Sequence, residues 1–99
     1  MKRRVGRSTS NVFLDLGFGP SEAQNLRVRA DLMIELIRII RSRRLTQASA
    51  AKLFQISQPR VSDLVTGKVD RFSIDALVEI LARAGRRVEL STKPARRVA

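Results

Sequence analysis

Apolar residues recur every three or four positions from residue 22 to residue 43, and these 22 residues contain no glycine or proline. The spacing predicts one long amphipathic helix. Pro20 lies just before it, and we expect Ser21 to cap its first turn. One apolar stripe consists of Leu26, Ala30, Met33, Ile37 and Ile40, and a second consists of Val28, Leu32, Leu36 and Ile39. Either both stripes are buried in the chain's own core, or one of them faces a second subunit.

Three shorter helices are predicted after the long one, and each follows a residue whose side chain can cap it. The capping residues are Thr46, Ser57 and Ser73, and the helices cover residues 47–54, 58–66 and 74–84. Gly67 and Gly85 follow the last two helices. Glycine is common there because it adopts the left-handed conformation that ends a helix.

Beyond Gly85 the apolar period changes from helical to alternating. Val88 and Leu90 alternate with Arg87, Glu89 and Ser91. This spacing predicts a short β-strand, which Pro94 ends. Because an unpaired apolar edge aggregates, we expect the strand to pair either with residues 12–14 or with its own copy in a symmetric partner.

The composition indicates one domain and an anionic partner. The chain has 99 residues, of which 43% are hydrophobic, and this suffices for one modest core. Its formal charge is +11, with +4 in residues 1–10, +3 in residues 92–99 and +4 in residues 11–91. The two ends lack an apolar pattern, so we expect a flexible basic arm over 1–10 and a basic tail over 92–99. A polyanion is the natural partner of such a chain.

Several function classes are disfavoured by what the sequence lacks. There is no Cys and no His, so thiol nucleophiles, imidazole catalysis and the usual zinc ligand sets are absent. We therefore expect neither an enzyme nor a metal or other cofactor. The lack of Trp and Tyr disfavours RNA binding by stacking. No apolar run approaches the ~20 residues of a membrane span, so a cytoplasmic protein without a membrane partner is expected.

Two short helices joined by a three- or four-residue turn, as predicted over residues 46–67, have the geometry of a helix-turn-helix. Ala51 is small where the helices approach each other, and Ile56 fills the turn. The second helix would be buried through Val61, Leu64 and Val65. Its opposite face carries Pro59, Ser62, Asp63 and Thr66, flanked by Gln58 and Arg60. This pattern is typical of an exposed recognition face.

Residues 45–51, 56–62 and 66–68 closely resemble the Cro/cI-like, Xre-type helix-turn-helix family. Residues 11–13, 70–73 and 85–90 resemble its small HigA-type antitoxin branch. The resemblance implies an all-α fold, a compact bundle of about five helices, with the DNA-binding domain over 11–91. It also implies a homodimer on palindromic double-stranded DNA, regulation of transcription as a repressor and, for the antitoxin branch, a RelE-like toxin as second partner.

The resemblance also assigns roles to single positions. The candidate DNA-binding residues are Gln47, Ser57, Gln58, Pro59, Arg60, Ser62, Asp63, Thr66 and Lys68. Gln47 and Lys68 would hold backbone phosphates. Gln58 would pair with adenine, and Arg60 would take guanine or a phosphate.

Two residues depart from the family pattern. Gln55 stands where the family commonly has glycine. A left-handed conformation there would cost on the order of 1 kcal/mol, which leaves room for a turn of another shape. Asp63 would be repelled by phosphates unless it accepts a hydrogen bond from cytosine or pairs with Arg60, and we expect the pairing with Arg60.

Two alternatives to an antitoxin remain, namely a free-standing phage-type regulator with no toxin and a protein-interaction module that uses the helix-turn-helix as a scaffold. A toxin would bind apolar residues near the N-terminus, flanked by acids. The apolar residues are Phe13, Leu14, Phe18 and Val28, and the acids are Asp15, Glu22 and Asp31. The same surface is also a candidate for the homodimer contact.

Overall fold

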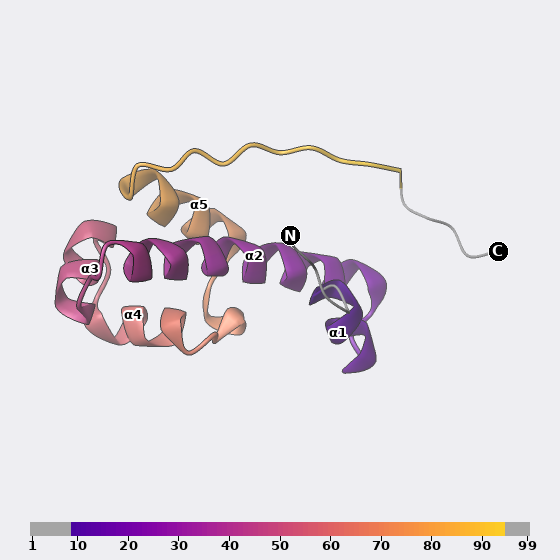
Figure 1. Ribbon diagram of the computed structural model, residues 1–99. Helices are drawn as coiled ribbons and strands as arrows, with labels where there is room; N and C mark the ends of the chain where they lie inside the picture. Colours follow the sequence, from indigo (N-terminus) through magenta and orange to yellow (C-terminus); the bar gives the residue numbers. More distant parts are fainter. Residues whose placement is uncertain (1–8, 95–99) are drawn as a thin grey trace.

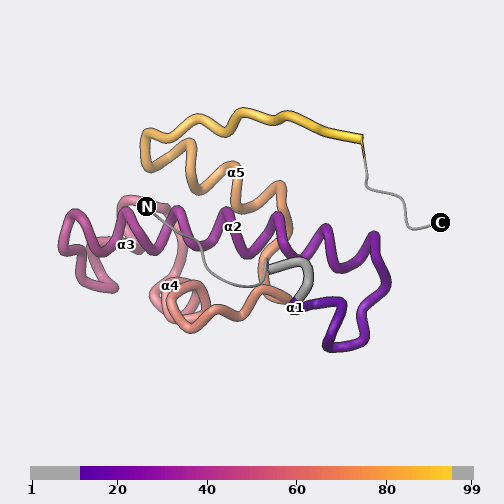
Figure 2. The backbone as a smooth tube through the Cα atoms, turned by 45° about the vertical axis from the view of Figure 1, so that its right-hand side comes forward, coloured from indigo at the N-terminus to yellow at the C-terminus, as the bar shows by residue number. Residues whose placement is uncertain are grey.

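The computed structural model describes residues 9–94, with side chains from Val12 onward. Its elements are α1 (Thr9–Asp15), α2 (Pro20–Ser42), α3 (Gln47–Phe54), α4 (Gln58–Val65), a 3-10 turn η1 (Val69–Arg71) and α5 (Ile74–Arg83). The described part is all-helical, as expected. Helix α2 runs through the middle, with α4 on one side and α5 on the other (Figures 1 and 2). Helices α1 and α3 lie near opposite ends of α2.

The three predicted capping residues all cap their helices. The bonds run from the backbone N–H of Ser49 to the Thr46 hydroxyl (3.0 Å), from Arg60 to Ser57 (3.3 Å) and from Ala76 to Ser73 (3.1 Å). Gly67 and Gly85 have the expected left-handed backbone, with φ of 75° and 85°. Local capping chemistry therefore sets the ends of the short helices.

The start of α2 differs from the prediction. The helix begins at Pro20, Gly19 is its N-cap, and no side chain caps it. Ser21 lies inside the first turn and is not the cap. Proline fits the first helical position because its missing N–H would have no partner there, and its fixed φ is already helical.

The second stripe of α2 is used mainly by the chain's own core. Leu36 and Ile39 are buried, whereas Val28 and Leu32 are half-buried. The largest fully buried side chains are Phe54, Phe72, Leu36, Leu64, Leu77, Ile80 and Val61. Phe72 lies between η1 and α5, and the others come from α2, α3, α4 and α5, so the core joins the helix-turn-helix to both α2 and α5.

Residues 12–14 are not a strand, which excludes them as the partner of the predicted C-terminal strand. They belong to α1, which packs against α2. The Phe13 ring meets Phe18 edge to face, with centroids 6.0 Å apart. The expected arm over 1–10 lies outside the described residues except for its last two, which begin α1, and the expected tail is described only as far as residue 94.

The predicted strand over residues 87–91 is also not seen, since no strand is present between residues 9 and 94. Instead, residues 86–94 run as an extended segment beside α5 and then along α2 (Figures 1 and 2). The physical reason is that a strand requires a second strand to bond with. The candidate partner within the chain has become helix α1.

Candidate nucleic-acid interface

Helices α3 and α4 are joined by the turn that a helix-turn-helix requires. Gln55 ends α3 in the left-handed conformation, with φ 59° and ψ 45°. The turn closes when the Ile56 N–H donates to the Ala51 carbonyl oxygen at 3.1 Å. The expectation that Gln55 leaves room for another turn shape is therefore wrong. The residue adopts the conformation for which glycine is better suited, because the buried Phe54 and the half-buried Ile56 on either side hold the chain there.

Replacing Gln55 with glycine is expected to raise the free energy of unfolding by about 1 kcal/mol, because glycine avoids the Cβ clash of the left-handed region. Chemical denaturation followed by circular dichroism measures the change. The matched control is Gln47→Gly, which places glycine in the first turn of α3 and should give no gain. A Gln55→Gly variant no more stable than the parent would show that this backbone carries no strain.

The exposed face of α4 carries most of the predicted recognition residues. Ser57, Gln58, Pro59 and Thr66 are exposed, and Ser62 is half-buried. The Thr66 hydroxyl donates to the Ser62 carbonyl oxygen at 2.8 Å, which leaves its methyl group for contact with a ligand. The helix is held through Val61 and Leu64, both fully buried. Val65 was also expected to be buried but is 38% exposed.

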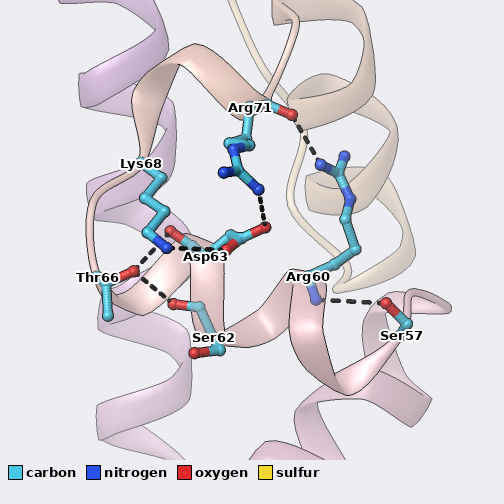
Figure 3. A network of polar contacts seen from close by, with 7 residues as sticks. All are labelled: Ser57, Arg60, Ser62, Asp63, Thr66, Lys68 and Arg71. Atoms are coloured by element: carbon cyan, nitrogen blue, oxygen red, sulfur yellow. Dashed lines mark hydrogen bonds and ion pairs between the residues drawn. The ribbon is translucent and has the colours of Figure 1, made fainter.

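Arg60 lies at the edge of this face and is tied to the protein. Its guanidinium stacks over the Phe72 ring, 4.1 Å from the ring centre to Cζ. It also donates from Nη1 to the Arg71 carbonyl oxygen at 2.7 Å (Figure 3). Phe72 is itself buried, so the stack joins α4 to the core behind η1. Through the stack on Phe72 and the bond to Arg71, Arg60 orients α4.

Asp63 does not pair with Arg60, contrary to the prediction. Its carboxylate lies 3.6 Å from Lys68 Nζ and 3.6 Å from Arg71 Nη1 (Figure 3). The side chain is only 16% exposed, whereas those of Lys68 and Arg71 are half exposed. The chain after α4 folds back through Gly67 and η1 and brings both cations to Asp63, while the Phe72 ring attracts Arg60 in another direction. The acid at the recognition helix is thus neutralised within the protein.

Arg71 is a candidate interface residue that sequence reasoning missed. It stands six residues beyond the end of α4, yet it shares the Asp63 carboxylate with Lys68. The signal available in the sequence was that Arg71 is a second basic residue only three positions after Lys68. Its approach to Asp63 depends on the 3-10 turn, which the apolar pattern did not predict.

Gln47 and Lys68, which the sequence predicts as phosphate-binding residues, are both exposed. Gln47 is the exposed first residue of α3. In the same turn Thr46 and Ser49 bond each other reciprocally, with the Thr46 N–H donating to Ser49 Oγ at 2.8 Å. Backbone N–H groups of a first turn attract anions. Lys68 follows α4 and is half exposed.

Two arginines from neighbouring helices hold the ends of the motif. Arg83 of α5 donates to the carbonyl oxygen of Phe54, the last residue of α3, at 3.0 Å. Arg29 of α2 donates to the carbonyl oxygens of Val69 (3.3 Å) and Phe72 (3.4 Å). The Phe54 carbonyl group lies at the end of a helix and lacks a partner within it, whereas the Val69 carbonyl oxygen also accepts from the Phe72 N–H at 3.4 Å. These bonds therefore fix the end of α3 to α5, and the residues on either side of the η1 turn to α2.

Over residues 9–94, no group of three acidic residues is placed to hold a metal ion. Among the helices of the same range, none is long and apolar enough to cross a membrane.

The geometry agrees with a comparison against known protein families. The model of a helix-turn-helix domain matches residues 12–93, which include α2, the motif and α5. No match was found among the curated proteins. With most of its length matched and α3 and α4 arranged as described, the chain belongs to the helix-turn-helix domain family.

Proposed function

We propose that this chain is a sequence-specific DNA-binding regulator of transcription that reads base edges with the exposed face of α4. The observation that carries the proposal is that one set of residues anchors α4 to the protein and another set is exposed. Val61, Leu64 and Arg60 hold it to the protein, whereas Gln58 and Pro59 are exposed on its first turn. A glutamine amide there can bond both N6 and N7 of an adenine in the major groove.

The regulator acts as a homodimer on a palindromic operator. A single eight-residue recognition helix contacts few base pairs, so a second copy is needed to select one site among many. Two copies related by a two-fold axis would place their α4 helices about 34 Å apart, one turn of DNA. Gln47 and Lys68 then hold phosphates on either side of each reading helix.

Binding to the DNA upstream of the chain's own gene, compared with random duplexes of equal length, tests this proposal. We expect a dimer on a pseudo-palindrome, with an affinity at least about a thousandfold above that for random DNA and falling steeply with salt. Equal affinity for both DNAs, or binding as a monomer, would reject the proposal. That result would favour a protein-interaction module that keeps the helix-turn-helix as a scaffold.

Asp63→Asn is expected to strengthen binding to random duplex. The carboxylate lies between Lys68 and Arg71, so its removal leaves both cations free for phosphates. One charge at a few ångströms in water is worth about 1 kcal/mol at low salt. The affinity for random DNA should rise by about thirtyfold for a dimer, which contains two such sites, while the ratio of operator to random affinity falls.

The matched control for Asp63→Asn is Glu22→Gln in the exposed first turn of α2, at the end of that helix away from α3. It makes the same change in net charge and should alter neither affinity by more than about twofold, because exposed charges farther than a Debye length are screened. Equal gains from both variants would mean that net charge alone, and not the Asp63 pairings, sets the affinity for random DNA.

We further propose that the regulator is a repressor and the antitoxin of a toxin–antitoxin pair. Apolar side chains gather on α1 and the turn after it, where Val12, Leu14, Leu16 and Phe18 are exposed. Leu16 is 68% exposed, which is unusual for a side chain next to a packed helix. Glu22 lies close by at the start of α2, whereas Asp31 is engaged by Arg27 at 3.1 Å. This surface suits a basic protein with an apolar patch.

Co-expression with the product of the adjacent reading frame tests the antitoxin role. We expect a stable complex that still binds the operator, because α1 lies at the end of α2 away from α3. Leu16→Asp should abolish the complex and leave operator binding unchanged. The absence of a complex would leave a free-standing regulator.

A further inference from the structure

In the C-terminal extended segment, residues 86–94, the backbone groups after Arg86 form no hydrogen bond with the backbone of the described residues. Within the part of the chain that the structure describes, the last backbone hydrogen bond runs from the Arg86 N–H to the Leu81 carbonyl oxygen at 2.9 Å. Leu90 is 86% exposed and Val88 is 38% exposed. An extended segment with free N–H and C=O groups and apolar side chains is a template for a second strand.

The side chains of this segment already alternate between two faces. Arg87 and Glu89, two residues apart, form an ion pair at 2.9 Å, so they lie on one face. Val88 lines an open pocket together with Val78 and Ala82 of α5, and Leu90 lines another beside Val28 of α2. Val88 therefore lies beside α5, whereas Leu90 is largely exposed, and Arg87 and Glu89 also line a pocket with Leu32 and Leu81.

We propose that residues 86–90 pair with the same residues of a second copy as an antiparallel two-stranded ribbon, with Val88 opposite Val88 on the two-fold axis. The inference names the contact of the dimer and so rests on the dimeric part of the proposed function. Its partner is a second copy of this chain because the segment is complementary to itself.

Charge selects this register among the three that centre on Val88, Glu89 or Leu90, and this register places Leu90 opposite Arg86. With Val88 on the axis, Arg87 of each copy lies directly opposite Glu89 of the other, and the attraction occurs twice. A register centred on Glu89 would place two carboxylates opposite each other. A register centred on Leu90 would place Arg87 opposite Lys93. Only the first register places opposite charges across the ribbon.

The ribbon also places both reading helices on one side of the dimer. The two-fold axis of an antiparallel pair is perpendicular to the ribbon, so both helical bundles lie on the face that carries Val88. In each copy the extended segment and α4 lie on opposite sides of α2 (Figures 1 and 2). Both α4 helices therefore lie on the side of the dimer away from the ribbon, where one DNA duplex can meet them.

Single-cysteine variants of the full chain read the register directly, because the chain has no cysteine of its own. Val88→Cys should form a disulfide-linked dimer under mild oxidation, since directly opposed Cα atoms lie about 4.5–5.5 Å apart. Glu89→Cys and Leu90→Cys should react at least about tenfold more slowly, because the offset along the strands separates their Cα atoms by more than the ~7 Å that a disulfide spans. Faster reaction of Glu89→Cys or Leu90→Cys, or no reaction of Val88→Cys, would overturn the proposal.

Charge reversal provides a second readout on the same ribbon. Arg87→Glu should weaken dimerisation about tenfold, because it creates two like-charge pairs, and the double variant Arg87→Glu/Glu89→Arg should restore it. Lys93→Glu makes the same charge change outside the paired residues and should have little effect. Arg87, Glu89 and Lys93 are all exposed, so these substitutions should not affect folding. Equal effects of Arg87→Glu and Lys93→Glu, or no rescue, would overturn the register.

Failure of this inference is distinguishable from failure of the proposed function. If the chain sediments as a dimer and binds an operator, but its Val88→Cys variant does not crosslink, the dimer has another contact and the chain remains a DNA-binding regulator. If the Val88→Cys variant crosslinks but the chain prefers no DNA sequence, the ribbon is present without the regulatory role.

Discussion

Phe72→Ala is expected to lower the free energy of unfolding by about 3–5 kcal/mol, because it removes a large buried side chain and leaves a cavity. Phe72 is 1% exposed and is among the largest fully buried side chains of the described residues. Its ring also supports Arg60, so the cavity would open directly behind the recognition helix. A domain of this size has a total stability of only about 5–15 kcal/mol, so the loss is a large part of it.

Urea denaturation followed by the helical circular dichroism signal measures this loss, since the chain has no Trp or Tyr to report by fluorescence. Phe18→Ala is the matched control, because Phe18 is 36% exposed and should cost about 1 kcal/mol or less. Similar losses in both variants would contradict the central position of Phe72.

Phe72→Leu separates packing from the stack on Arg60. Leucine keeps most of the buried apolar volume and should cost about 1.5 kcal/mol, but it offers no aromatic face to the guanidinium. If Arg60 orients α4, this variant should lose operator affinity at temperatures where it is still fully folded. Unchanged operator affinity would show that the stack on Phe72 is not needed to position α4.

Gln58→Ala is expected to weaken operator binding by about 1–3 kcal/mol for each half-site and to change binding to random duplex little. Gln58 is exposed on the first turn of α4 and makes no contribution to the core. Truncation therefore removes base contacts without disturbing the fold. Titrations on the operator and on a random duplex at the same salt concentration measure both affinities.

Lys68→Ala is the companion variant, and it should weaken binding to both DNAs alike, because a phosphate contact carries no sequence information. It should also reduce the slope of log affinity against log salt by about 0.9 for each phosphate that is no longer neutralised. Lys93→Ala, on the extended segment across α2 from α4, makes the same substitution and should leave both affinities unchanged. If Gln58→Ala lost equal affinity for both DNAs, Gln58 would not contact base edges.

Much of the fold was predictable because the relevant signals are local. The caps at Thr46, Ser57 and Ser73 act within three residues, so the spacing along the chain predicts them correctly. Helix α1 was not predictable in this way. Its apolar run over residues 12–14 is too short to distinguish a helical period from a strand.

The candidate site was predictable in its exposed residues but not in its internal partners. The period of α4 correctly separates the buried Val61 and Leu64 from the exposed Gln58. The partners of Arg60 and Asp63 depend on η1, which returns Arg71 and Phe72 to the helix. Such contacts result from tertiary packing and leave no mark in the period of the sequence.

The separation of faces on α4 has a consequence for how such a regulator can evolve. Substitutions at exposed positions cost folding stability little, usually within about 0.5 kcal/mol. Gln58 and Pro59 are exposed, while the anchoring of the helix lies elsewhere, on Val61, Leu64 and Arg60. Descendants of one ancestral gene can therefore acquire new target sites by changing a few exposed side chains, and related copies in one genome can become insulated from one another while their scaffold stays the same.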